Sequence, residues 1–152
     1  MTEPDSPEDD PLRLDLQVCF PLYAATNLIG RLYRPVLARL GLTYPQYLVM
    51  LVLWEDERQT VGSLGARLYL DSGTLTPLLK RMDAAGLVFR RRDAEDERRV
   101  QIGLTDKGRA LRTQAAHVPQ TLAGGYEGEG LEELRETVRR LVAVLAKHSA
   151  SS

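Results

Sequence analysis

The residue best able to do covalent chemistry in this sequence is its single cysteine, Cys19. It lies near the expected start of a helix, where the helix dipole and free backbone amides stabilise a thiolate. Four of the six tyrosines follow at positions 23, 33, 44 and 47, and phenol hydroxyls can donate hydrogen bonds to a thiolate. The pattern indicates a reactive thiol. The alternative is a cysteine that is simply packed on an apolar stripe, with the tyrosines as core or interface filler.

The sequence contains few cysteine and histidine residues that could bind a metal or form a disulfide. One cysteine cannot form a disulfide within the chain, and His117 and His148 lack cysteine partners at zinc-ligand spacing. The sequence therefore predicts no metal site and no cofactor.

Basic residues are concentrated in one segment. From Lys80 to Arg112 there are 10 basic and 6 acidic residues, a net charge of +4, whereas the rest of the chain has 10 basic and 15 acidic residues and nets −5. The overall charge of −1 hides a segment suited to nucleic acid, because the distribution of charge matters more than its total.

The segment that carries Cys19 is expected to be helical. Residues 1–11 are acidic and contain three prolines, which predicts a disordered tail. Apolar residues then recur at three- and four-residue steps from Leu12 toward Leu40, which is typical of one helix. Pro21 should lie in its first turns or kink it, and Gly41 should end it.

The middle of the chain predicts a helix-turn-helix. The apolar run Gln46 to Trp54 favours a buried helix. Thr60 is a candidate N-cap for a short helix over 61–68, and Asp71-Ser72 caps another over 73–85 that ends at Gly86. The inward stripe of that second helix is predicted to consist of Leu75, Leu78, Leu79 and Met82.

Two short strands are expected next, over 87–92 and 99–104, joined by a charged hairpin loop. Such a hairpin after a helix-turn-helix forms a wing. A further helix should run from Thr105 to about Val118, and a last amphipathic helix from Leu131 to about Lys147.

These elements predict a mainly α fold, a winged helix-turn-helix within a single domain over residues 12–148. The winged part covers 46–105. Long terminal helices with apolar stripes do not fit a small winged domain, so 12–45 and 106–148 are predicted to form a dimerisation region.

The outward side of the second helix suits a recognition helix in the major groove. We expect DNA contacts from Ser72, Thr74, Thr76, Lys80 and Arg81. In the hairpin loop, Asp96 is expected to pair with Arg98 and hold its guanidinium toward a narrow minor groove. The alternatives are an ordinary solvated helix and a solvated charged turn.

Four stretches together resemble one protein family: LDLQVCFPLYAA, YRPVLARLGLTYPQYLVMLVLWE, LYLDSGTLTPLLKRMDAAGLV and RRRDAEDERRVQIGLTDKG. They are similar to the MarR family of winged-helix repressors, and within it to the organic hydroperoxide sensing branch (OhrR type). The resemblance runs from about Leu14 to Lys147. It implies a homodimer that represses a peroxidase gene by binding a pseudopalindromic operator in double-stranded DNA.

The resemblance also implies residue roles. Cys19 would be the peroxide sensor, and Tyr33 and Tyr44 would contact the sensor thiol of the partner subunit. The recognition helix would run from Ser72 to Ala85, and Arg98, supported by Asp96, would enter the minor groove.

The chain is similar to the one-cysteine type, because the resolving cysteine of other members is missing. After oxidation to a sulfenic acid, the next step must use an outside small thiol or further oxidation. We expect a mixed disulfide to inactivate reversibly and a sulfinic or sulfonic acid to inactivate permanently.

Three other functions stay open at this point: a repressor controlled by a small phenolic ligand, a thiol peroxidase, and a protein-interaction module. A peroxidase is disfavoured because no thioredoxin-like pattern is found, so we expect no enzyme.

Length and composition set the remaining bounds. A chain of 152 residues with 43% hydrophobic and 27% charged residues fits one globular domain. No apolar run approaches the ~20 residues of a membrane span, and the acidic start lacks the features of a signal peptide. We therefore expect a cytoplasmic protein with no membrane partner.

Overall fold

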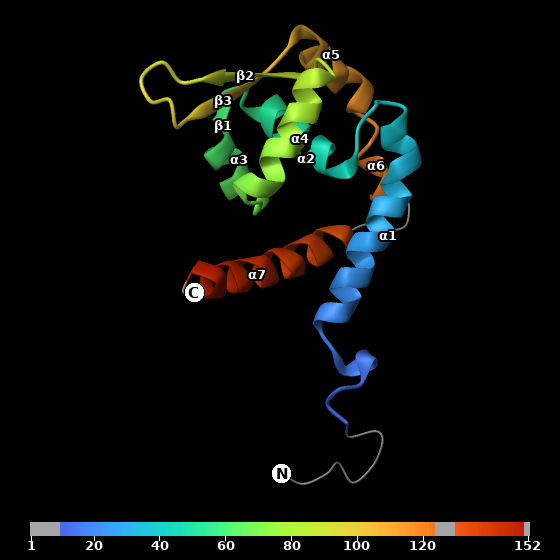
Figure 1. The fold of residues 1–152 in the computed structure, drawn as a ribbon. Coiled ribbons are helices and arrows are strands. Elements are labelled where there is room, and N and C mark those ends of the chain that lie inside the picture. The colour runs from blue at the N-terminus through green and yellow to red at the C-terminus, as the bar shows by residue number, and fades with distance from the viewer. Residues whose placement is uncertain (1–9, 124–129, 151–152) are drawn as a thin grey trace. The chain divides into compact units, whose positions relative to one another are not determined.

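The structure, a computed structural model, describes residues 10–123 and 130–150. The tail predicted over residues 1–11 lies outside the described residues except for its last two positions. The fold is mainly helical with one small antiparallel sheet (Figure 1), as the sequence predicts. The chain divides into two compact units, one up to Ala115 and one from Ala116. None of the described helices is long and apolar enough to cross a membrane.

In its described residues, the first unit contains a short 3-10 helix η1 (Leu14–Leu16), five α-helices and three strands. They are α1 (Cys19–Ala38), α2 (Tyr44–Glu55), β1 (Gln59–Thr60), α3 (Val61–Leu68), α4 (Ser72–Ala84), β2 (Val88–Arg92), β3 (Val100–Leu104) and α5 (Asp106–Ala115). The second unit contains α6 (Gln120–Ala123) and α7 (Gly130–Ala150).

Helix α1 begins at Cys19, seven residues later than the expected start at Leu12. Pro21 lies in the first turn, where its missing N–H is not needed by the helix, so no kink is required there. The helix ends at Ala38, two residues before the predicted end at Leu40, and the turn that follows contains Gly41 with a φ of 69°. The Leu42 amide donates back to the Leu37 carbonyl at 3.1 Å, which closes the helix end.

Side-chain caps define the starts of the next three helices. Thr43 forms a reciprocal capping box with Gln46 at the start of α2, which therefore begins slightly before the predicted position. Thr60 caps α3 in the same way. At α4, the Asp71 carboxylate accepts from the Thr74 amide at 2.7 Å. Each cap satisfies amides that have no partner within the helix.

The buried side of α4 confirms the predicted inward stripe. Leu75, Leu79 and Met82 are fully buried, and Leu78 is nearly so. Helix α4 packs against α2, α3 and β2. This packing fixes which side of α4 is left facing outward.

The sheet has the order β1-β3-β2, with both pairings antiparallel. The hairpin of β2 and β3 confirms the predicted wing. Phe89 on β2 lies opposite Gly103 on β3, and a Cβ at residue 103 would come within 2.3 Å of the Phe89 ring. The missing side chain at Gly103 therefore leaves the space that the Phe89 ring occupies.

Helix α5 is joined to α2 by one long-range hydrogen bond. The Trp54 indole N–H donates to the Gly108 carbonyl at 3.0 Å. A Cβ at Gly108 would lie 2.0 Å from the Leu87 carbonyl oxygen, so the approach of α5 to the start of β2 also depends on glycine. Helix α5 ends at Ala115 rather than near Val118.

Helix α7 lies close to its predicted bounds but has no buried residue in a single chain. Its predicted apolar stripe is exposed or half-buried at Leu134, Val138, Leu141, Val142 and Leu145. Dimerisation through the terminal helices stays a prediction.

Candidate DNA interface and redox site

Cys19 is exposed, as the first residue of α1. Its neighbour Val18 is 75% exposed, and Phe20 and Tyr23 are also exposed. The single chain therefore does not bury the cysteine in an apolar core. The thiol is open to a reactant or to a second protein chain.

Two of the predicted partners of the thiol do meet each other. The rings of Tyr33 on α1 and Tyr44 on α2 are 5.2 Å apart in an edge-on arrangement, at 66°, and Tyr47 lies 6.2 Å from Tyr44. Burial, and secondarily the neighbouring Tyr33, raises the pKa of Tyr44. The pKa of Tyr47 is raised mainly by burial too. Both phenols therefore keep their protons at neutral pH and can act as donors.

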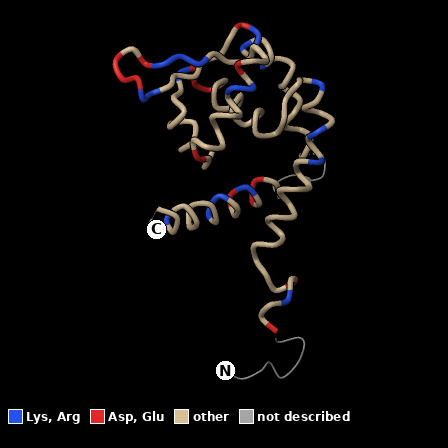
Figure 2. Tube along the Cα trace, in the orientation of Figure 1, with Lys and Arg blue, Asp and Glu red and all other residues tan. Residues whose placement is uncertain are grey.

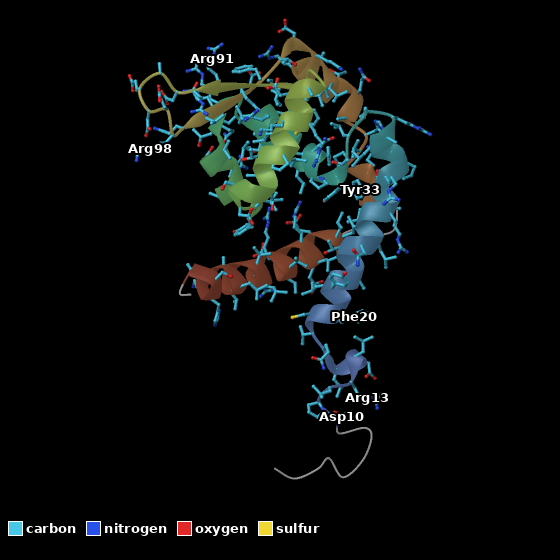
Figure 3. All side chains as sticks on the ribbon, in the orientation of Figure 1. Asp10, Arg13, Phe20, Tyr33, Arg91 and Arg98 are labelled. Carbon is cyan, nitrogen blue, oxygen red and sulfur yellow. The ribbon has the colours of Figure 1, made fainter. Side chains whose placement is uncertain are left out.

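The structure does not bring Cys19 and this tyrosine pair together within one chain. Tyr33 follows Cys19 by fourteen positions on the same helix, which corresponds to about 21 Å at 1.5 Å per residue. Figure 3 shows Phe20, next to Cys19, toward one end of α1 and Tyr33 toward the other. A hydrogen bond from Tyr33 or Tyr44 to Cys19 therefore requires a second copy of the chain.

The outward positions of α4 are placed as a recognition helix needs. Ser72, Thr74, Lys80 and Arg81 are exposed and Thr76 is half-buried. At about 100° per residue, Ser72, Thr76 and Lys80 follow one flank, and Thr74 and Arg81 follow the opposite one. Small residues lie between the two rows at Gly73, Pro77 and Ala84. This arrangement leaves room for a close approach of the helix to a groove.

The predicted pairing of Asp96 with Arg98 is confirmed. The Asp96 carboxylate accepts from the Arg98 amide at 3.1 Å and from its Nε at 3.3 Å. The Arg98 side chain is still 94% exposed. The carboxylate therefore orients the guanidinium without covering it.

A second acidic residue of the wing tip, Asp93, fixes the loop through hydrogen bonds. Figure 2 shows acidic residues gathered at the tip and basic residues along β2. Asp93 accepts from the Glu95 amide at 2.9 Å, and this bond is the main reason that the pKa of Asp93 is lowered. The Asp93 amide in turn donates to the Arg99 carbonyl at 2.8 Å. Part of the negative charge at the tip is thus used to fix the loop that presents Arg98.

Two arrangements of basic residues were missed from the sequence. The Arg91 guanidinium lies over the Phe89 ring, 5.4 Å from its centroid, and strand alternation could have placed these two side chains on one face. Arg31 and Arg34 on α1 line a pocket with Tyr44. The sequence pattern that could have indicated this pair is two arginines spaced i, i+3 on a helix that contains no acidic residue.

Comparison with known proteins identifies the family. A sequence model described as transcriptional regulator SarA/Rot matches residues 31–114. The organic hydroperoxide resistance transcriptional regulator of Bacillus subtilis (strain 168) is 46% identical over 138 residues, which cover 90% of this chain and 94% of the relative. The chain belongs to the MarR family of winged-helix transcriptional regulators. This MarR-family protein is also 54% identical to the HTH-type transcriptional regulator TtmR of Methylorubrum extorquens (strain PA1), over 90% of this chain and 69% of the relative.

A solved structure agrees with this family assignment. Reduced AbfR bound to DNA has a TM-score of 0.74 and 35% identity to the MarR-family chain, and the match covers 91% of this chain and 97% of that one. The relatives are DNA-binding transcriptional regulators rather than enzymes, which answers the peroxidase alternative. In the part of the chain described, no cluster of three His, Cys, Asp or Glu side chains could hold a metal ion.

Proposed function

We propose that this regulator is a cytoplasmic repressor that binds a pseudopalindromic operator as a homodimer and leaves it when an organic hydroperoxide oxidises Cys19. The observation that carries the proposal is the separation along α1 of the exposed Cys19 thiol from the Tyr33–Tyr44 pair. Two copies related by a twofold axis meet this requirement symmetrically, because each supplies a thiol to the other's tyrosines.

The dimer also explains the exposed apolar residues at the start of the chain. Leu14, Leu16, Val18, Phe20 and Leu28 are all exposed in the single chain. A group of exposed large apolar side chains of this kind is typical of an interaction site. Packing against a second copy removes it from water at the same place where Cys19 needs its partners.

The proposed DNA-binding surface consists of helix α4 and the wing, both of which are packed within one chain. Helix α4 enters the major groove with Ser72, Thr74, Thr76, Lys80 and Arg81. Arg98, oriented by Asp96, enters the neighbouring minor groove, where a guanidinium is attracted by the enhanced negative potential. In the dimer the two recognition helices must lie about 34–36 Å apart to read two half-sites.

The sensing chemistry begins with the thiolate of Cys19. The sulfur attacks one oxygen of the hydroperoxide, so that an S–O bond forms while the O–O bond breaks. Sulfur is oxidised by two electrons to a sulfenic acid, and the peroxide is reduced to an alkoxide that takes a proton from water. A small thiol then attacks the sulfenic sulfur, forming a mixed disulfide and releasing water. Thiol exchange restores the reduced protein.

The group added to Cys19 is the change that weakens DNA binding. A mixed disulfide places a new group between the thiol and the partner's tyrosines, which changes the packing of α1 and hence the spacing of the recognition helices. AbfR has been solved in a disulfide form, and overoxidised AbfR has been solved bound to DNA. By analogy with these two forms, we assign release to the mixed disulfide, which departs from the expectation that sulfinic or sulfonic acid inactivates the protein permanently.

An operator-binding assay tests the proposal. The wild type and Cys19→Ser are each titrated onto the operator, with and without an organic hydroperoxide, and with and without a small thiol. We expect both proteins to bind when untreated, and only the wild type to be released, with the thiol adduct on Cys19 seen by mass spectrometry. Release of Cys19→Ser would refute the proposal and favour a ligand-controlled repressor.

Stoichiometry separates a sensor from a peroxidase. With a small thiol in excess, we expect about one equivalent of hydroperoxide to be consumed per chain in the time that release from the operator takes. Consumption of many equivalents at the same thiol concentration would contradict a sensor role.

A further inference from the structure

A pocket of about 580 Å³ lies between the second half of α1 and the start of α2. Its lining includes Asn27, Arg31 and Arg34 from α1, and Thr43 and Tyr44 from α2. The volume is within the range of pockets that hold small molecules, about 300–1,000 Å³. The lining is rich in donors, since it combines two guanidinium groups with a phenol hydroxyl.

The two arginines of this pocket lack a counter-charge. Both are exposed, and no carboxylate pairs with either of them in the described parts of the chain. Helix α1 contains no acidic residue from Cys19 to Ala38. Like charges at i, i+3 on a helix repel each other weakly, and an anion bound between them would remove this repulsion. Elsewhere, by contrast, Arg67 and Arg109 are paired with carboxylates at 2.8 Å.

Tyr44 connects this pocket to the sensor thiol. Its ring lies against Tyr33 and also lines the pocket. Under the proposed function, on which this inference rests, the same tyrosine contacts Cys19 of the partner subunit. The pocket then opens beside the thiol, and a molecule held in it can present its reactive group to the sulfur.

We propose that Arg31 and Arg34 bind the carboxylate of a small molecule that reacts with the partner subunit's Cys19. Arginine suits this role because its planar group accepts a carboxylate through two parallel hydrogen bonds. Two reactants can carry the carboxylate: the organic hydroperoxide that oxidises the thiol, or the small thiol that resolves the sulfenic acid. In both cases the carboxylate only positions the molecule, and the bonds made and broken are those of the sensing chemistry above.

The test compares matched reactants on matched variants. In the first arm, loss of the Cys19 thiol is timed with a water-soluble hydroperoxide that bears one carboxylate, and with the methyl ester of the same compound. In the second arm, the sulfenic acid is trapped with 3-mercaptopropionate or with 2-mercaptoethanol. The proteins are the wild type, Arg31→Gln, Arg34→Gln, the double variant, and Arg39→Gln as control. Arg39 is also exposed at the end of α1 but does not line the pocket.

We expect the wild type and Arg39→Gln to react about tenfold faster with the carboxylate-bearing reactant in at least one arm, as for one charge-assisted hydrogen bond. The double variant should lose this preference while its rate with the neutral reactant is unchanged. A preference in the first arm alone identifies the oxidant as the ligand, and a preference in the second alone identifies the thiol.

Three results would overturn the inference. The first is a wild type with no preference in either arm, while the ester still oxidises Cys19, which would leave the proposed function standing. The second is a preference that survives in the double variant. The third is a double variant that weakens dimerisation without changing the preference, which would make the pocket a contact between copies. Failure of both hydroperoxides to oxidise Cys19 would remove the proposed function itself, and this inference with it.

Discussion

The winged helix-turn-helix and the first half of α1 differ in how completely one chain packs them. In the winged part, Leu75 and its neighbours on α4 are fully buried, the helix starts are capped and the wing loop is hydrogen-bonded. On α1, Leu28 is 59% exposed and Cys19 lies open. The comparison shows that the winged part is packed within one chain, whereas under the proposed function the sensing site needs two.

The largest effect is expected on the stability of the winged helix-turn-helix. Leu75→Ala removes a fully buried side chain from the packing of α4, and we expect it to lower the free energy of unfolding by about 2–5 kcal/mol. Urea denaturation measures this loss. Leu51→Ala, at a position 37% exposed on α2, is the control. Equal losses in the two variants would contradict the assignment of α4 to the core.

The second largest effect is expected on dimerisation through the exposed apolar face of α1. Leu28→Asp places a charge on the exposed apolar face of α1 in both copies of the dimer. Because burial of a leucine contributes roughly 1.5–3 kcal/mol, we expect the dimer dissociation constant to rise by at least about tenfold. Sedimentation velocity over a dilution series measures it. Unchanged association would place the dimer contact elsewhere.

A smaller effect is expected at the wing. Arg98→Ala should weaken operator binding by about 1–2 kcal/mol, because it removes a guanidinium from a narrow minor groove. Arg98→Lys should recover part of this loss by keeping the charge, and Asp96→Asn should cause a smaller one by releasing the pair seen at 3.3 Å. Fluorescence anisotropy on operator and random duplexes distinguishes these cases. An alanine variant that binds like the wild type would exclude Arg98 from the interface.

The smallest effect is on the rate of sensing. Tyr44→Phe removes one donor to the thiol and keeps the ring, so we expect oxidation of Cys19 to slow by a few-fold, in line with about 1 kcal/mol for a hydrogen bond, with operator binding unchanged. Burial raises the pKa of Tyr44 above its ordinary 10.0. The phenol therefore stays protonated below about pH 10 and loses its proton only as the pH rises through the folded-state pKa.

The rate ratio of wild type to Tyr44→Phe tests this protonation directly. Stopped-flow measurements between about pH 7 and 9 should give a constant ratio, since the donor is present throughout. A ratio that falls toward one in this range would mean that Tyr44 ionises there.

Much of the fold could be predicted because its signals are local. The stripe at Leu75 and Met82, the cap at Asp71 and the turn at Gly41 after α1 depend on residues within a turn or two of each other. The Asp96–Arg98 pair was predictable for the same reason, since two positions separate its members. Strand β1 was missed because two residues have no periodicity, and its pairing with β3 is a long-range contact.

The start of α1 and the arrangement of the site were harder to predict. Leu12 and Leu16 continue the helical spacing, but no core of this chain positions them, so the backbone there forms a turn and a 3-10 helix instead. The Tyr33–Tyr44 contact and the pocket at Arg31 and Arg34 depend on how α1 crosses α2, which no short pattern encodes. The family resemblance implied the roles of Cys19, Tyr33 and Tyr44, and the structure adds that Cys19 and Tyr33 lie fourteen positions apart on one helix.

Inter-subunit disulfide trapping tests most directly whether two chains build one sensing site. Tyr44→Cys is made in the chain that keeps Cys19, and also in a Cys19→Ser background as control. After mild oxidation, we predict that the first protein migrates as a covalent dimer on a non-reducing gel and that the control stays monomeric. Mass spectrometry should place the link between Cys19 and the substituted position 44. A first protein that stays monomeric while its thiols remain oxidisable would contradict a sensing site shared between two copies.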